Sequence, residues 1–127
     1  MENKIISPND TVSIQIKRAT CWITLNRPKS LNALNGELVK ALLHVTSSIE
    51  KNKEIRAVVI EGAGEHFMSG GDIKEFNLII SKSKNNKELA RDFERILHDF
   101  HQVIKNMQAM PQPIISCLKG AVAGAGI

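Results

Sequence analysis

Two glycine-rich segments carry residue types suited to holding a negatively charged oxygen. The first, residues 67–74, reads Phe-Met-Ser-Gly-Gly-Asp-Ile-Lys and follows an apolar run at 57–60 and a Gly-Ala-Gly turn at 62–64. A helix that opens at Asp72 leaves backbone N–H groups without intrahelical acceptors, and paired glycines let a ligand approach the main chain closely. An N–H placed there stabilises a carbonyl oxygen that gains charge during a reaction.

The second segment, residues 120–127, reads Gly-Ala-Val-Ala-Gly-Ala-Gly-Ile. Small residues at this density predict a second close approach of the backbone, at the start of another helix. Main-chain donors are therefore expected at both segments.

The elements that must position these segments alternate between strand and helix. Polar and apolar residues alternate over 11–17, and a second apolar run at 21–25 follows a short connection, so the two predict a β-hairpin. Asn35 is a plausible helix cap before apolar residues at helical spacing, which predict a helix over 36–51. A strand is predicted at 55–60.

The second half of the chain predicts one short and one long helix. Residues 72–76 are expected to form a single helical turn, and the polar run 81–87 a mobile loop over the binding site. Strict helical spacing of apolar residues, Phe93 and Phe100 among them as core residues, predicts a helix over 86–108. A buried strand is expected at 114–118. This alternation predicts an α/β fold with right-handed crossovers.

Composition limits the partners of the 127-residue chain. Aromatic residues are 4% and Tyr is absent, which argues against a stacking surface for nucleic acid. The net charge of +4 is spread out, which suits an anionic small molecule better than DNA. No apolar stretch reaches the length that spans a bilayer, and Cys21 and Cys117 are expected to be small buried side chains. We expect no nucleic-acid or membrane partner and a reducing setting, which is the cytoplasm or an organelle matrix, with the cytoplasm favoured.

Other polar residues have a functional and a plainer interpretation, and the plainer one is favoured for each. Glu61 and Glu65 are expected to be solvated turn residues and not an acid/base pair. His98 and His101 have a spacing that suits a metal, but no third ligand is evident, so no metal site is predicted. His66 is expected to be a loop residue, and Asp72 a helix cap.

The lysines of the polar run are expected to be solvated, although they could steer phosphates; they are Lys82, Lys84 and Lys87.

Three segments together resemble the crotonase superfamily, the enoyl-CoA hydratase/isomerase enzymes. They are residues 23–34, residues 58–75 and residues 113–126. The resemblance covers essentially the whole chain and implies a spiral of β-β-α units. Residues 1–127 would be the N-terminal part of a single acyl-CoA-binding domain, without its C-terminal catalytic and trimerisation part.

The resemblance also implies site residues. The N–H groups of Gly71 and Ala125 would polarise a thioester carbonyl and stabilise an enolate-like intermediate. The positions implied to contact coenzyme A are Lys29, Ser30, Ala33, Ser69, Asp72, Ile73 and Lys74. Coenzyme A would enter as part of the acyl-CoA substrate, with no permanently bound cofactor.

The resemblance leaves the reaction open. The acid/base carboxylates of hydratases would fall beyond Ile127, so the fragment alone is expected to be inactive, and its parent to be a homotrimer or hexamer. The Ala-Gly-Ala-Gly run at 123–126 is closer to isomerases, so hydration of 2-enoyl-CoA and double-bond isomerisation both remain.

Two further hypotheses come from other functional classes. One is a non-catalytic CoA-binding or scaffold module of the same fold. The other is a dinucleotide-binding domain, which is disfavoured because the glycine run 62–64 lacks the third glycine of that fingerprint.

Overall fold

Four strands form one mixed sheet in the computed structural model, which describes residues 4–127. The strands are β1 (Val12–Lys17), β2 (Thr20–Leu25), β3 (Ala57–Gly62) and β4 (Ile114–Cys117), and they lie in the order β1-β2-β3-β4. β1 pairs antiparallel with β2, whereas β2, β3 and β4 are parallel. The carboxyl ends of β2, β3 and β4 therefore lie at the same end of the sheet.

The predicted hairpin is confirmed, with a connection of two residues. Arg18 and Ala19 have φ values of 50° and 70°. Two left-handed residues in a row give the turn type that matches the twist of paired strands.

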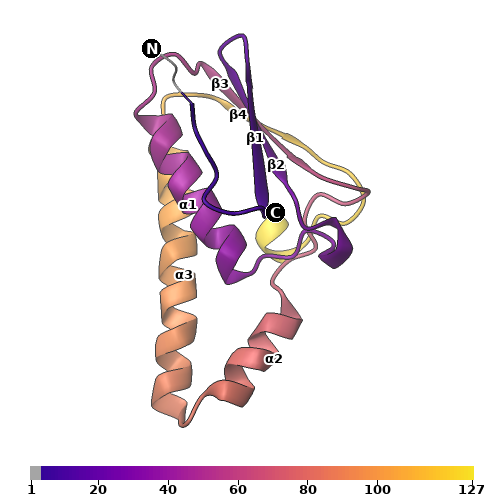
Figure 1. Cartoon of the computed structure of the whole chain (residues 1–127), viewed down its shortest axis with the longest axis vertical. Helices are drawn as coiled ribbons and strands as arrows, with labels where there is room; N and C mark the ends of the chain where they lie inside the picture. The colour runs from indigo at the N-terminus through magenta and orange to yellow at the C-terminus, as the bar shows by residue number, and fades with distance from the viewer. Residues whose placement is uncertain (1–3) are drawn as a thin grey trace.

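Two helices cover one face of the sheet (Figure 1). They are α1 (Gly36–Glu50) and α3 (Asn86–Ala109), close to the predicted ranges 36–51 and 86–108. Asn35 caps α1 by accepting a 2.9 Å hydrogen bond from the Leu38 N–H, as predicted. Buried Leu38, Val45 and Ile49 of α1 belong to the hydrophobic core together with Ile23 of β2 and Val58 of β3.

A polar contact fixes α3 against α1. The buried amide of Asn106 donates to the Thr46 hydroxyl (3.0 Å) and to the Ser47 hydroxyl (3.1 Å). Because a buried polar group without a partner is costly, these bonds favour one register of the two helices.

The segment between β3 and α3 differs from the prediction. α2 (Ile73–Lys82) is a helix of ten residues, not a single turn, and α3 begins at Asn86. The predicted loop 81–87 is therefore wrong except at residues 83–85. The polar run contains the N-cap of α3, because the Asn85 side chain accepts from the Glu88 N–H at 2.8 Å.

The prediction of a buried strand at 114–118 is wrong about burial. β4 forms at Ile114–Cys117, but it is the last strand of the sheet, and Ile115 is 55% exposed. Cys117 is exposed as well, whereas Cys21 in β2 is fully buried. No helix within residues 4–127 is both long and apolar enough to cross a bilayer.

Candidate functional site

Three segments meet at the end of the sheet where the parallel strands have their carboxyl ends. The first follows β2 and contains η1 (Pro28–Ser30), the second follows β3, and the third follows β4 and contains η2 (Gly124–Gly126). Leu34 of the first segment and Gly71 of the second form a parallel bridge. The Leu34 N–H donates to the Gly70 carbonyl (2.7 Å), and the Asp72 N–H donates to the Leu34 carbonyl (3.0 Å).

Asn32 holds the first two segments together, a role that sequence analysis missed. The residue is fully buried and left-handed, with φ 54°. Its amide donates to the carbonyls of Ala63 (3.0 Å) and His66 (2.8 Å), and its side-chain oxygen accepts from the Arg27 N–H (2.8 Å). Asn tolerates this backbone conformation better than most residues, which is the one local signal in the sequence.

The third segment lies directly against the second. Met68 and Val122 form another parallel bridge, in which the Met68 N–H donates to the Ala121 carbonyl (3.2 Å). The approach is close at the glycines: a Cβ added to Gly126 would lie 2.7 Å from the Met68 carbonyl oxygen. Gly70, with φ 120°, passes beside Gly124, which supports the predicted close backbone approach.

The N–H groups of Gly71 and Ala125 have no acceptor within residues 4–127. In a parallel bridge the bonds are made by the flanking amide groups, so the Gly71 N–H points away from Leu34. Ala125 is the second residue of η2, a position whose N–H has no partner inside its own helix. Both are therefore available to a ligand.

All seven positions implied to contact coenzyme A line one cleft of about 290 Å³, together with Leu31 and Gly71. Lys29 and Lys74 are exposed at the cleft, and Ile73 is 72% exposed. Ala33 and Asp72 are each 7% exposed and lie at the inner wall. The structure thus brings together residues that lie more than thirty positions apart in the sequence.

Asp72 is a helix cap as predicted, and it also forms an ion pair. Its carboxylate accepts from the Glu75 N–H (3.1 Å) and from the Arg27 guanidinium (2.9 Å). Burial opposes ionisation of this carboxyl, but the bond from Glu75 and the charge of Arg27 outweigh burial and lower its pKa. Arg27 also donates to the Ala33 carbonyl, so one side chain connects both walls of the cleft.

Glu75 extends the same connection to α1. Its carboxylate accepts from the Gly36 N–H at 2.9 Å. A carboxylate at a helix N-terminus is favourable, so α1 and α2 are joined at their first turns.

A smaller apolar hollow of about 160 Å³ lies beside Ala125. Its lining includes Leu25, Met68, Phe100 and Val103 from β2, the second segment and α3. Phe100 packs against the core as predicted, whereas Phe93 contacts Phe76 of α2.

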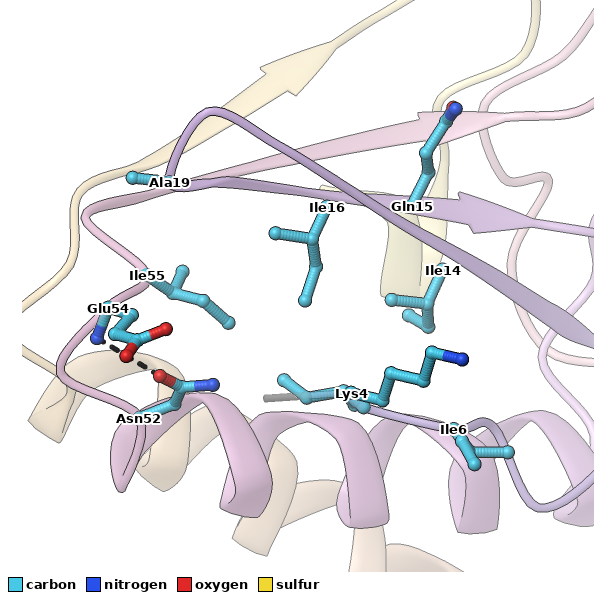
Figure 2. A pocket seen from close by; sticks show the side chains of 10 residues that line it. Lys4, Ile6, Ile14, Gln15, Ile16, Ala19, Asn52, Glu54 and Ile55 are labelled. Carbon is cyan, nitrogen blue, oxygen red and sulfur yellow. Dashed lines mark hydrogen bonds between the residues drawn. The ribbon is translucent and has the colours of Figure 1, made fainter. Parts of the chain in front are cut away.

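Another hollow lies beside the hairpin, at the opposite end of the strands from the cleft (Figure 2). It holds about 550 Å³ between β1, the N-terminal segment and the turn after α1, with Ile14, Ile16 and Ile55 among its lining. None of the predicted site residues lines it.

The remaining candidates lie apart from the cleft. Glu61 accepts from the Thr24 hydroxyl in the sheet (3.1 Å), while Glu65 is exposed in the turn. His98 and His101 are exposed on α3, and no three potential metal ligands gather within residues 4–127.

The lysines of the polar run are exposed and do not line the cleft; they are Lys82, Lys84 and Lys87.

A sequence model of enoyl-CoA hydratases/isomerases matches residues 20–127. The chain belongs to the enoyl-CoA hydratase/isomerase family. The match includes every residue of the cleft and both glycine-rich segments, so the resemblance found in the sequence is confirmed.

Similar proteins are named for different functions. The chain is 35% identical over 105 residues to the short-chain-enoyl-CoA hydratase of Clostridium acetobutylicum, covering 82% of this chain and 37% of the relative. It is 28% identical to the 1,2-epoxyphenylacetyl-CoA isomerase of Escherichia coli, over 87% of this chain and 40% of the relative. It is also 31% identical to the small ribosomal subunit protein mS47 of Schizosaccharomyces pombe, over 94% of this chain and 27% of the relative.

Solved structures confirm the fold. Pseudomonas aeruginosa AtuE superposes with a TM-score of 0.81 at 32% identity, covering 92% of this chain and 43% of that one. An enoyl-CoA hydratase/isomerase from Marinobacter aquaeolei gives 0.78 at 33% identity, covering 91% and 44%. The chain therefore has a partial crotonase fold and spans less than half of these structures.

Proposed function

We propose that this chain binds the thioester end of an acyl-CoA and stabilises its enolate through the N–H groups of Gly71 and Ala125. The observation that carries the proposal is that both N–H groups lack an acceptor within residues 4–127, on segments held against each other. Two main-chain donors aimed at one carbonyl oxygen favour the state in which that oxygen is negative.

Hydration and isomerisation both pass through such a state. Addition of water to the β-carbon of a 2-enoyl thioester, or removal of a proton next to the carbonyl, places negative charge on the thioester oxygen. We propose one of these reactions for the whole protein, of which this chain spans 37% to 40% judged by the hydratase and isomerase relatives.

The cleft suits the nucleotide and pantetheine parts of coenzyme A. Lys29 and Lys74 line it and provide positive charge for phosphates. The Asp72 carboxylate already accepts hydrogen bonds from Arg27 and from the Glu75 N–H. Its role is therefore to hold Gly71 in place rather than to bind coenzyme A. The apolar hollow beside Ala125 is suited to the first carbons of an acyl chain.

The test uses acetoacetyl-CoA, whose enolate absorbs in the ultraviolet. A site that stabilises the enolate raises its fraction at a given pH, so binding and oxyanion stabilisation are read in one titration. Ala125→Pro removes one N–H while keeping a φ that suits a helix start. We expect this variant to lower the enolate fraction of the bound ligand by about tenfold or more. The reason is that loss of a single oxyanion donor weakens stabilisation of the charged oxygen by at least this factor.

Ala125→Gly is the matched control, since it keeps the N–H and changes only the methyl group. It should retain the enolate signal of the unmodified chain. Equal signals from the proline and glycine variants would contradict the proposed donor. Binding of NADH without binding of acetoacetyl-CoA would contradict the proposed ligand.

A second candidate is a non-catalytic module of the same fold. The similarity to a ribosomal protein supports it, because that relative is named for a ribosome and not for a reaction. Such a module would leave the enolate fraction of acetoacetyl-CoA unchanged, whether or not it binds coenzyme A.

A further inference from the structure

His66 makes a contact that its position in a turn does not predict. Its Nδ1 lies 2.9 Å from the backbone nitrogen of Ala121 in the third segment. A backbone N–H only donates, so Nδ1 must be an acceptor without a proton. The contact therefore requires a neutral imidazole that carries its proton on Nε2.

The imidazole supplies an acceptor that the backbone does not offer. Around it, the Phe67 N–H donates to the Lys119 carbonyl (2.9 Å), and the Ala123 N–H donates to the Met68 carbonyl (3.1 Å). Within residues 4–127 no main-chain carbonyl accepts from the Ala121 N–H. Without His66 this half-buried amide would lose its partner, which is unfavourable.

The backbone at Gly120, next to this bond, leaves no room for a side chain. Gly120 has φ 56°, and a Cβ added there would lie 2.3 Å from the Glu65 carbonyl oxygen and 2.5 Å from His66 Nδ1. The third segment therefore lies in close contact with the Nδ1 edge of the imidazole. Ala125 lies four residues after Ala121 in the same segment.

We infer that His66 is a positioning residue, which sets the path of the third segment and through it the direction of the Ala125 N–H. This inference rests on the proposed function. His66 itself lines neither the cleft nor the apolar hollow beside Ala125, so it acts through Ala121. What the position requires is an acceptor at the place of Nδ1, not an imidazole as such.

Three substitutions separate this requirement from a general need for bulk. In His66→Asn the side-chain oxygen takes the place of Nδ1, whereas in His66→Gln the amide lies one methylene further out. His66→Ala removes the acceptor. We expect the asparagine variant to bind acetoacetyl-CoA and raise its enolate fraction almost as the unmodified chain does. The other two should lose about tenfold in the enolate signal.

Amide exchange of the unliganded chain gives a reading that needs no ligand. We expect the Ala121 N–H to exchange slowly in the unmodified chain and the asparagine variant, and faster in the glutamine and alanine variants. Nitrogen NMR of the imidazole should show Nδ1 unprotonated.

The outcomes separate the two proposals. Equal enolate signals from the asparagine and glutamine variants, or fast Ala121 exchange in an unmodified chain that binds acetoacetyl-CoA, would overturn the role of His66 alone. No binding by the unmodified chain would overturn the proposed function, and with it the role of His66 in binding.

Discussion

Among single residues, Asp72 combines several interactions at the site. It caps α2, pairs with Arg27 and donates its own N–H to Leu34. The two charged side chains are 18% and 10% exposed, so water screens their attraction less than at an open surface. Three separate contacts therefore hold Asp72, the residue that follows Gly71.

Removing the charge of Asp72 should make stability less dependent on pH. Its folded-state pKa is lowered, so its contribution is present above the unfolded pKa and is lost as the pH falls through the folded value. Asp72→Asn keeps an oxygen for the helix cap but leaves Arg27 without a counter-charge. We expect a loss of about 1–3 kcal/mol in the free energy of unfolding at neutral pH.

Urea denaturation across the acidic range checks this expectation. The two unfolding curves should converge as the pH falls and the unmodified carboxylate becomes protonated. A difference that stays constant with pH would show that the cap, and not the charge, is what the substitution disturbs.

The family resemblance implied the residues that line the cleft but not those that hold it in shape. Asn32, Arg27 and His66 act through partners 31 to 55 residues away. A local pattern contains no record of such distant partners. Their roles become visible only when the three segments are seen together.

Among the elements, α2 has an aromatic contact with α3 but no fully buried residue. The helix has ten residues and none of them is buried. Phe76 meets Phe93 of α3 edge to face, with ring centres 5.5 Å apart (Figure 1 shows both helices). A helix this short is marginal in water without tertiary support.

Phe93→Ala should loosen α2 while leaving the core intact. We expect faster hydrogen exchange at the amides of Ile73–Lys82 and unchanged exchange in α1 and the strands, because the core cluster does not include Phe93. Leu97→Ala, at a position 53% exposed on the same helix, is the control and should leave α2 unchanged. Equal exchange in both variants would show that α2 is held by other contacts.

The elements that were predicted well have long, regular apolar patterns. The helices over 36–51 and 86–108 carry many apolar residues at one spacing, and the hairpin has clear alternation. The length of α2 was missed because Leu78, Ile79 and Ile80 are consecutive and show no helical spacing, and because Ser81 and Lys82 belong to the polar run. Burial of β4 was missed because an apolar sequence does not say which strand lies at the edge.

At the scale of the whole molecule, β4 leaves one edge of the sheet unpaired within the described chain. Ile115 is 55% exposed there and Leu118 is 60% exposed. An apolar edge strand is a template for pairing with another chain.

Ile115→Lys should therefore lower self-association of the chain. A charge at an exposed edge should change the free energy of unfolding by less than about 0.5 kcal/mol. Sedimentation at several concentrations measures the effect, with Ile80→Lys on the exposed face of α2 as a control that should not change association. A fall in association with both variants would point to net charge and not to the sheet edge.

The buried side chain of Asn32 also has a kinetic consequence. Its bonds to Ala63 and His66 close stretches of 31 and 34 residues, and the sheet around it is largely parallel. Contacts between such distant residues form late in folding. The chain loses the entropy of closing the loop before the contact itself contributes any stabilisation. A ligand that binds only the completed site cannot speed up folding, but it slows unfolding. On the proposed function, acyl-CoA would therefore lengthen the lifetime of the native chain without shortening the time needed to reach it.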